Sequence, residues 1–387
     1  MSRPLTPPFH TPPARPLADE TPGPAGVPAD ASEGLALIKP SVRGQPGYTL
    51  SSPTARRKLN QNESAYDLPP SLKAEVLAEV ASAPWQRYPE FAPAALLEQL
   101  AGHYGWHADG ILVGNGSNEL IQATLSVSLA SGDVVVSPSP TFSLYRLLTN
   151  VLGGRYHPVA AGPNFELNVD ALIETAVKER ARVVVVNSPN NPTGAALAEG
   201  AVERILAETG ALVVCDEAYQ EFGGPTALPL LGTTSRLVVL RTFSKALGMA
   251  GLRFGLALTH PAVARELAKG KLPYNVNVVT LAAASAALRS RQVLAARTRE
   301  IVETRDAFAR RARAIGGLTV FPSSANFVLI RCGGVPAREV FRRLFEEDGI
   351  LVRDVSGAPE LAECLRISVG TPADMEATAA ALERILG

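Results

Sequence analysis

Lys245 has the residue type and the sequence position of a catalytic amine. It lies in the stretch Arg-Thr-Phe-Ser-Lys-Ala-Leu at 241–247, directly after the apolar run 237–240. We therefore expect a strand that ends in a turn carrying the lysine, where loops commonly hold functional residues. Of the 37 lysines and arginines only seven are lysines, so a lysine here favours a role that needs a deprotonated amine, such as a Schiff base. A surface lysine after a strand is the other interpretation of this residue alone.

Other residues with chemical potential follow other apolar runs. Asp216 closes the run Leu-Val-Val-Cys-Asp, where a carboxylate is costly unless it has a partner such as a protonated ring nitrogen. Ser117 and Asn118 begin a helix-patterned segment, whose exposed N–H groups bind phosphate, although simple N-capping also explains them. Arg253, eight residues after Lys245 in a glycine-flanked loop, can add positive charge to the same phosphate.

Short β-branched runs alternate with helix-patterned segments, and this alternation predicts the elements that position these residues. Strands are expected at 133–136, 183–187, 212–216, 237–241 and 254–258. Helices are expected at 118–130, 169–180 and 198–208. The pattern predicts an α/β fold with a parallel sheet covered on both faces, and ligands are expected beyond the carboxyl ends of its strands.

The remainder of the chain predicts a second α/β unit and an N-terminal extension. A long helical stretch at 278–315 precedes strand patterns at 318–331, 350–353 and 365–369 and helix patterns at 336–348 and 372–386. Residues 1–40 are crowded with proline, alanine and glycine, so we expect a disordered extension. The predicted domains are therefore this extension, an N-terminal segment at 41–70, a large domain at 71–285 and a small domain at 286–387.

The composition argues against several classes of protein, among them nucleic-acid-binding, disulfide-rich and membrane-spanning proteins. The net charge is zero and the pI is near 7, which argues against nucleic acid or an anionic membrane as the main partner. Three cysteines without a CxxC motif suggest neither disulfides nor a zinc site, and no apolar run reaches the length of a membrane span. We expect a cytoplasmic protein. His103 and His107 are interpreted as structural, because no third metal ligand accompanies them.

The order of these motifs resembles the fold type I aminotransferases, which use pyridoxal 5′-phosphate, over roughly residues 45–387. Within that group, Arg-Tyr-Pro-Glu at 87–90, Leu-Pro-Tyr-Asn-Val-Asn at 272–277, Ile-Leu-Val-Arg-Asp at 350–354 and Leu-Arg-Ile-Ser-Val-Gly at 365–370 resemble the histidinol-phosphate aminotransferases. The resemblance implies a large domain with a mixed, mostly parallel sheet covered by helices, plus a smaller C-terminal α/β domain. It also implies a homodimer.

The resemblance assigns a role toward the cofactor to each matching position. Lys245 is expected to form the Schiff base and then to move the substrate proton, Asp216 to hold the ring nitrogen protonated, and Tyr219 and Asn191 to bind the 3′ oxygen. Phe142 is expected to stack on the ring, where the family often has tyrosine. The phosphate is expected to be bound by these residues: Ser117, Asn118, Thr242, Ser244, Arg253 and, from the neighbouring subunit, Tyr88.

For the substrate, Arg366 matches the arginine that binds the α-carboxylate, a bidentate task to which the guanidinium is suited. Arg353 matches the arginine associated with the distal phosphate of histidinol phosphate. Tyr48 and Asn62 lie in the segment expected to close over the site.

The expected activity is transamination between histidinol phosphate with 2-oxoglutarate and imidazole acetol phosphate with glutamate. A threonine-phosphate decarboxylase and an aromatic or broad-specificity aminotransferase remain open, because reaction specificity depends on which Cα bond stands perpendicular to the ring. A cofactor-dependent transcription regulator on the same fold needs a DNA-binding winged helix before it. The Pro-rich leading segment is too short for that.

Overall fold

The computed structural model describes residues 30–45 and 53–387. Residues up to Gly44 form a unit of their own, with two short helices, α1 (Ser32–Ala36) and α2 (Pro40–Arg43), neither of which buries a residue. The disordered extension predicted for residues 1–40 thus contains a short helix at 32–36. Such a helix can form without a hydrophobic core, because its backbone hydrogen bonds are local. Residues 1–29 of the predicted extension lie outside the described residues.

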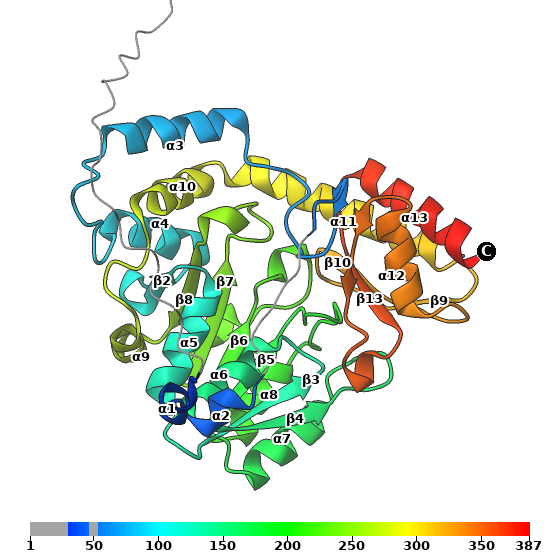
Figure 1. Ribbon diagram of the computed structural model, residues 1–387. Coiled ribbons are helices and arrows are strands. Elements are labelled where there is room, and N and C mark those ends of the chain that lie inside the picture. The colour runs from blue at the N-terminus through cyan, green and yellow to red at the C-terminus, as the bar shows by residue number, and fades with distance from the viewer. Residues whose placement is uncertain (1–29, 46–52) are drawn as a thin grey trace, which may run out of the picture. The chain divides into compact units, whose positions relative to one another are not determined.

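A seven-stranded sheet organises the larger unit, which comprises residues 45–387 (Figure 1). Its strand order is β2-β8-β7-β6-β5-β3-β4. The bounds are β2 (Ile111–Gly114), β3 (Val134–Ser139), β4 (Arg155–Ala160), β5 (Val183–Asn187), β6 (Leu212–Asp216), β7 (Leu237–Thr242) and β8 (Gly255–Thr259). Only β8 runs antiparallel to its neighbours, β7 and β2. The sheet is thus mixed and mostly parallel, as the family resemblance implies, and β8 departs from the parallel sheet that the apolar pattern predicts.

Side chains that alternate along each strand enter two different apolar cores. On β5, Val183 and Val185 pack with α5 (Ser117–Ser128), α6 (Leu144–Leu152) and α9 (Pro261–Leu267). Val184 and Val186 pack on the other face. That face is covered by α3 (Pro70–Ser82), α4 (Ala94–Tyr104), α7 (Val169–Lys178), α8 (Ala201–Glu208) and α10 (Val278–Arg289). A strand buried on both faces explains the continuous valine run of β5.

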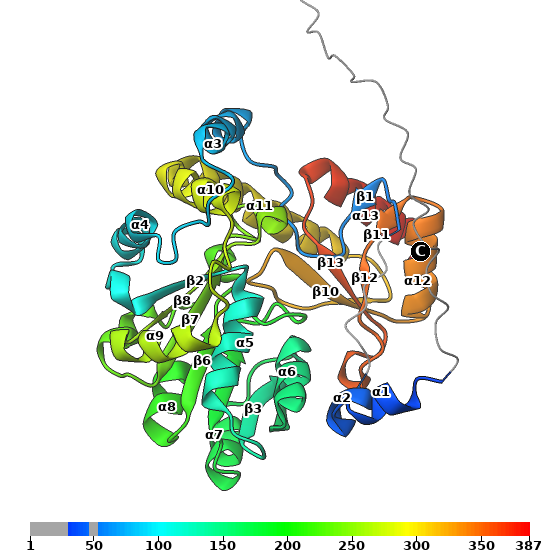
Figure 2. The same ribbon diagram turned by 60° about the vertical axis from the view of Figure 1, so that its left-hand side comes forward.

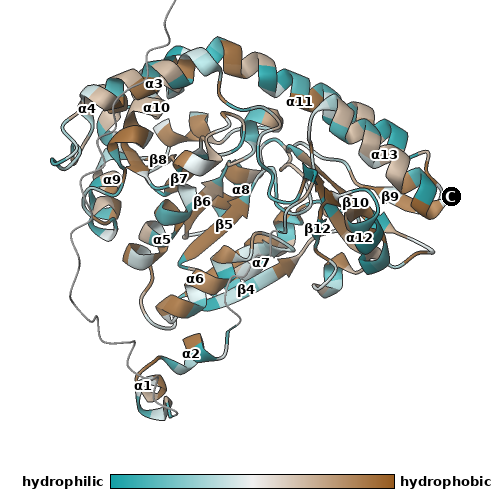
Figure 3. Ribbon diagram, turned by 45° about the horizontal axis from the view of Figure 1, so that its top comes forward, coloured by the Kyte–Doolittle hydropathy of each residue, from teal (hydrophilic) through white to brown (hydrophobic). Residues whose placement is uncertain are grey.

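A second, four-stranded antiparallel sheet has the order β12-β13-β10-β9 and is separate from the first (Figure 2). Its strands are β9 (Leu318–Val320), β10 (Phe327–Cys332), β12 (Arg353–Asp354) and β13 (Cys364–Ser368). It packs with α11 (Arg291–Ala312), α12 (Ala337–Glu346) and α13 (Pro372–Leu386). Hydrophobic residues concentrate on β5 and β10, while α11 and α12 also carry hydrophilic stripes (Figure 3). None of the described helices is long and apolar enough to cross a membrane.

Short elements complete the chain. The strand β1 (Arg57–Lys58) pairs in parallel with β11 (Ile350–Leu351), and the two form a separate two-stranded sheet. Single 3-10 turns occupy Ala108–Gly110, Gln220–Phe222, Leu228–Gly232, Ala250–Leu252, Ala268–Gly270 and Pro359–Leu361.

The structure differs from the predicted elements at a few places. The sequence patterns miss β2 and β4, which are short or have exposed positions. The helix expected at 278–315 is interrupted at Ser290, which caps the end of α10 and precedes α11. Both sheets lie in one compact unit, so the domain boundary at 285 stays a prediction.

Candidate active site

Lys245 lies in the turn after β7, and its environment favours a neutral amine. The Nζ atom donates to the carbonyl of Gln61 at 3.0 Å and lies 5.7 Å from the ring centre of Tyr219. Burial, followed by the positive charge of Arg366, lowers the pKa of Lys245 from 10.5 to about 7. A large fraction of the lysine is therefore deprotonated near neutral pH, which a nucleophilic amine requires.

Asp216 ends the neighbouring strand β6 as a buried carboxylate, 3% exposed. Its Oδ2 accepts a 2.6 Å hydrogen bond from the hydroxyl of Tyr145, and its Oδ1 accepts one from the backbone N–H of Ala218 at 3.1 Å. Burial raises the pKa of Asp216 to about 6, while the Tyr145 hydroxyl opposes that rise. A carboxylate held in this way can pair with a cationic ring nitrogen.

Tyr219 follows β6 and is held by the N-terminal segment. Asn62 donates from Nδ2 to the Tyr219 hydroxyl at 3.0 Å. Asn62 is itself 1% exposed with φ of 54°, a strained conformation for a residue with a side chain. Ser368 and Asn326 bond to its backbone and side chain. The structure thus brings residues 61 and 62 against the turn that carries Lys245, whereas Tyr48 lies outside the described residues.

The start of α5 and the loop after Lys245 come together as a candidate anion site, called the cup below. Gly116, with φ of 82°, precedes α5, and a Cβ there would lie 2.3 Å from the Arg253 guanidinium. Arg253, also in the left-handed region at φ 58°, donates to the Ser244 hydroxyl at 3.2 Å. Ser117 is the first residue of α5 and is 8% exposed. A helix start, a hydroxyl and a guanidinium therefore converge, as phosphate binding requires.

Two further residues predicted for this cup lie beside it. The hydroxyl of Thr242 at the end of β7 accepts from the backbone N–H of Ser244 at 3.2 Å and donates to the Phe254 carbonyl at 3.1 Å. Asn118 is exposed at the second position of α5.

Arg366 on β13 is brought to the loops of the large sheet. It donates to the Asn191 side chain at 2.5 Å and to the Asn60 carbonyl at 2.8 Å, and its guanidinium lies 5.4 Å from the ring centre of Phe327. Arg353 on β12 is its partner in the antiparallel register. Directly opposed residues project from the same face of a sheet, so the two cations are neighbours, an arrangement favoured when anions bind between or beside them.

Two predicted aromatic residues differ in their surroundings. Phe142 precedes α6 and contacts Tyr145 edge to face at 5.7 Å between ring centres, which places it beside the residue that binds Asp216. Tyr88 is 80% exposed and stacks on Tyr274 at 4.6 Å. The part of the chain that the structure describes therefore does not place Tyr88 in its own cup, and its predicted role across a dimer stays a prediction.

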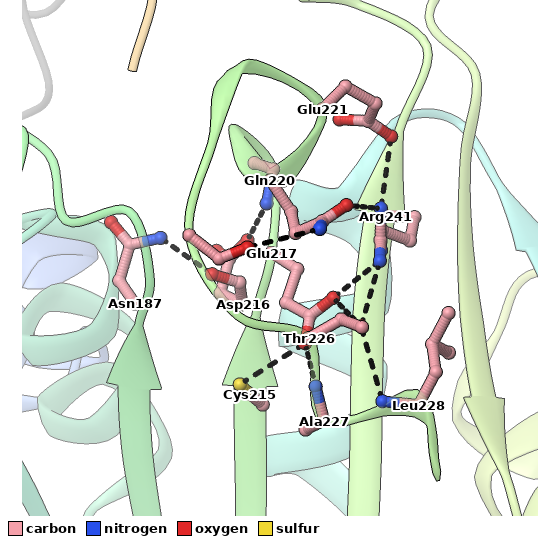
Figure 4. A network of polar contacts seen from close by, with 12 residues as sticks. Asn187, Cys215, Asp216, Glu217, Gln220, Glu221, Thr226, Ala227, Leu228 and Arg241 are labelled. Carbon is pink, nitrogen blue, oxygen red and sulfur yellow. Dashed lines mark hydrogen bonds and ion pairs between the residues drawn. The ribbon is translucent and has the colours of Figure 1, made fainter. Parts of the chain in front are cut away.

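A buried ion-pair network follows Asp216 at the ends of β6 and β7 (Figure 4). Glu217, fully buried, pairs with Arg241 at 2.6 Å and accepts from the backbone N–H of Ala227 at 2.6 Å. Arg241 also pairs with Glu221 at 3.2 Å and donates to Gln220 at 2.7 Å. The network joins the loop that carries Tyr219 to the strand that leads to Lys245, and each buried charge has a partner.

Sequence reasoning missed Tyr145, Asn60 and the Glu217–Arg241 pair. Tyr145 had a detectable signal, because it lies three residues after Phe142 and shares one turn of the chain with it. Asn60 takes part through its backbone carbonyl, which no side-chain pattern reports. Glu217 directly follows the predicted strand 212–216 and Arg241 ends the predicted strand 237–241, but their pairing depends on the adjacency of β6 and β7.

These residues fit the cofactor that the sequence predicts. A phosphate suits the cup at Gly116, an amine of low pKa suits a carbonyl partner, and a buried carboxylate suits a ring nitrogen. No group of three histidine, cysteine or acidic side chains that could hold a metal occurs among residues 30–45 and 53–387.

Comparison with known proteins decides the family. Residues 57–382 match the family model of class I and II aminotransferases. The chain belongs to this family. The chain is 36% identical over 337 residues to a histidinol-phosphate aminotransferase of Chlorobaculum parvum, covering 87% of this chain and 94% of the relative. It is 38% identical over 352 residues to histidinol-phosphate aminotransferase 2 of Bordetella parapertussis, covering 90% and 96%.

Solved aminotransferase structures agree with the fold. A histidinol-phosphate aminotransferase from Sinorhizobium meliloti, determined in complex with pyridoxal 5′-phosphate, superposes with a TM-score of 0.82 at 27% identity. The match covers 91% of this chain and 98% of that one. A threonine-phosphate decarboxylase from Porphyromonas gingivalis, at 23% identity and a TM-score of 0.73, shares the fold. The resemblance to histidinol-phosphate aminotransferases is thus confirmed.

Proposed function

We propose that this aminotransferase interconverts L-histidinol phosphate and 2-oxoglutarate with imidazole acetol phosphate and glutamate, a reaction of histidine biosynthesis. The observation that carries the proposal is that the neighbouring strands β6 and β7 end in a buried carboxylate, Asp216, and in the turn that holds Lys245. Relatives at 36% and 38% identity, named for this activity, support the choice of substrate.

The cofactor of the proposed reaction is pyridoxal 5′-phosphate. When bound, it supplies an electron sink for the charge left on the substrate carbon after proton removal. Lys245 would provide the amine that binds its carbonyl and, once the substrate amine has replaced it there, would accept that proton, which its lowered pKa allows. Asp216 would keep the ring nitrogen charged, Tyr219 and Asn191 would bind the 3′ oxygen, and Phe142 would pack on the ring.

The two neighbouring arginines would divide the recognition of the substrates. Arg366, buried and hydrogen-bonded to Asn191, is suited to the α-carboxylate of glutamate, which accepts two parallel N–H bonds. Arg353 is half-buried and lies opposite Arg366 in the strand pairing. It is therefore suited to the distal phosphate of histidinol phosphate. Asn62 contributes by holding the Tyr219 hydroxyl.

We further propose that the enzyme is a cytoplasmic homodimer. Three exposed aromatic side chains form a patch on the surface: Tyr88 (80%), Phe91 (67%) and Tyr274 (44%). Tyr274 contacts Tyr88 and Phe91 directly, and a contiguous exposed aromatic patch is typical of an interface. A second copy of the chain would bury it and bring Tyr88 to the partner's phosphate cup. Three buried, unbridged cysteines agree with a reducing compartment.

The decisive experiment is a product assay with purified protein, pyridoxal 5′-phosphate, histidinol phosphate and 2-oxoglutarate, scored for glutamate. Glutamate formation that depends on both substrates supports the proposal. Release of carbon dioxide from threonine phosphate, with no reaction of histidinol phosphate, would show a decarboxylase instead. Glutamate formed from phenylalanine but not from histidinol phosphate would indicate an aromatic aminotransferase.

A further inference from the structure

Glu119 is an acidic residue in the turn that, in the proposed function, binds the cofactor phosphate. It occupies the third position of α5, two residues after Ser117. A carboxylate there repels a bound phosphate, so its presence calls for a compensating contact. Its Oε2 accepts from the backbone N–H of Asn115 at 2.6 Å and from Nδ2 of Asn275 at 2.8 Å.

The loop that contains Asn275 is attached to this turn at a second point. Lys271 donates from Nζ to the carbonyl of Val113 at the end of β2, and Asn275 reaches the same carbonyl at 3.4 Å. Burial lowers the pKa of Lys271, and the charge of Glu119 opposes that effect. The carboxylate, the ammonium and the amide therefore form one cluster that joins loop 271–277 to the phosphate-binding turn.

The same loop holds the exposed aromatic residues in place. Tyr274 has φ of 56° and stacks on Tyr88 with 17° between the ring planes, and Phe91 meets Tyr274 edge to face. A tyrosine in the left-handed region persists only where the surroundings fix it. The contacts of Asn275, the next residue, provide that fixation.

Helix capping alone does not account for these contacts. A glutamate at the third helical position is favoured by the helix dipole and bonds within its own turn. Glu119 does this through Asn115, but its second partner, Asn275, lies 156 residues away in the chain. This contact joins the start of α5 to loop 271–277, and capping of α5 does not require it.

We propose that Glu119 is a positioning residue that couples the phosphate-binding turn to the aromatic patch formed by Tyr88, Phe91 and Tyr274. The proposal rests on the proposed function, since the anion at the turn is the cofactor phosphate. Its consequence is that a phosphate bound at the turn stiffens loop 271–277, and that disturbing the patch loosens the hold on the cofactor.

The test compares cofactor release and loop protection in three variants. Glu119→Ala removes the oxygen that accepts from both donors, and Glu119→Gln keeps an acceptor oxygen but loses the charge. The control is Glu98→Ala, because Glu98 is an exposed glutamate on α4. We expect Glu119→Ala to release pyridoxal phosphate from the holoenzyme about tenfold faster, the order expected when the shared acceptor of two donors is lost. Glu119→Gln should recover part of this, and Glu98→Ala should match wild type.

Hydrogen exchange of the amides in loop 271–277 provides a readout that does not need the cofactor. Exchange should be faster in Glu119→Ala than in Glu98→Ala at equal melting temperature. A double-mutant cycle completes the test: Tyr274→Ala should speed cofactor release in wild type but add little in Glu119→Ala. The coupling would be overturned if the two substitutions multiplied each other's effect on the rate of cofactor release. It would also be overturned if Glu119→Ala released the cofactor at the wild-type rate. Failure of wild type to retain the cofactor would instead refute the proposed function.

Discussion

Replacement of Lys245 by methionine should stabilise the cofactor-free protein while abolishing its reaction. The folded-state pKa of this lysine is about 7, against 10.5 for an ordinary solvated lysine. Between these values the unfolded chain holds a proton that the folded chain does not. The free energy of unfolding therefore rises with pH through this window, and the destabilisation is complete below pH 7. Methionine has a similar length and no charge, so it removes the effect.

The magnitude follows from the shift. The difference of 10.5 − 7 = 3.5 in pKa corresponds to about 5 kcal/mol at ~1.36 kcal/mol per unit. The side chain is half-buried, and solvent screening reduces this to about 2–4 kcal/mol. Lys245→Met should exceed wild type in stability by that amount near neutral pH, and the difference should shrink as pH approaches 10.5.

Urea unfolding of the two cofactor-free proteins across neutral and alkaline pH measures the effect. Lys73→Met serves as the control, because Lys73 is exposed and pairs only with Asp67 at the surface. Parallel pH profiles for wild type and Lys245→Met would refute the lowered pKa and, with it, the reason for assigning the amine to this residue.

Four further outcomes are expected. Borohydride reduction of the holoenzyme followed by peptide mapping should find the pyridoxyl group on Lys245, and its recovery on another lysine would contradict the assignment. Asp216→Asn should lower kcat far more than cofactor affinity, because an amide cannot keep the ring nitrogen charged; a near wild-type kcat would exclude that role. Tyr145→Phe should raise the pKa of Asp216 above about 6, because the hydroxyl that stabilises the carboxylate is gone. The free energy of unfolding should therefore fall by about 1.5–3 kcal/mol above that pH and by less below pH 3.8, where the carboxyl is protonated. A decrease that does not depend on pH would show a packing effect. Arg353→Ala should reduce kcat/KM for the histidinol phosphate half-reaction about 30-fold or more, from a charge-pair loss of at least ~2 kcal/mol, and the glutamate half-reaction less; equal losses in single-turnover kinetics would remove its substrate role.

Local sequence was sufficient for the central strands and for the residues at their ends. The predicted strands at 183–187 and 212–216 coincide with β5 and β6, because strands buried on both faces need an unbroken apolar run. Asp216 and Lys245 were predicted at strand ends because polar residues directly follow such runs. The direction of β8 and the break at Ser290 were not predictable, since neither changes the local apolar pattern.

The candidate site residues and the cofactor that they suit could be inferred from the sequence, because residue type and spacing belong to one chain. Their partners could not, because those contacts arise only when the chain folds. Asn62 meets Tyr219 across 157 positions, Arg366 meets Asn60 across 306, and Glu119 meets Asn275 across 156. The lowered pKa of Lys245 arises from burial and from the charge of Arg366 on another sheet, and such effects depend on distance in space rather than on position in sequence.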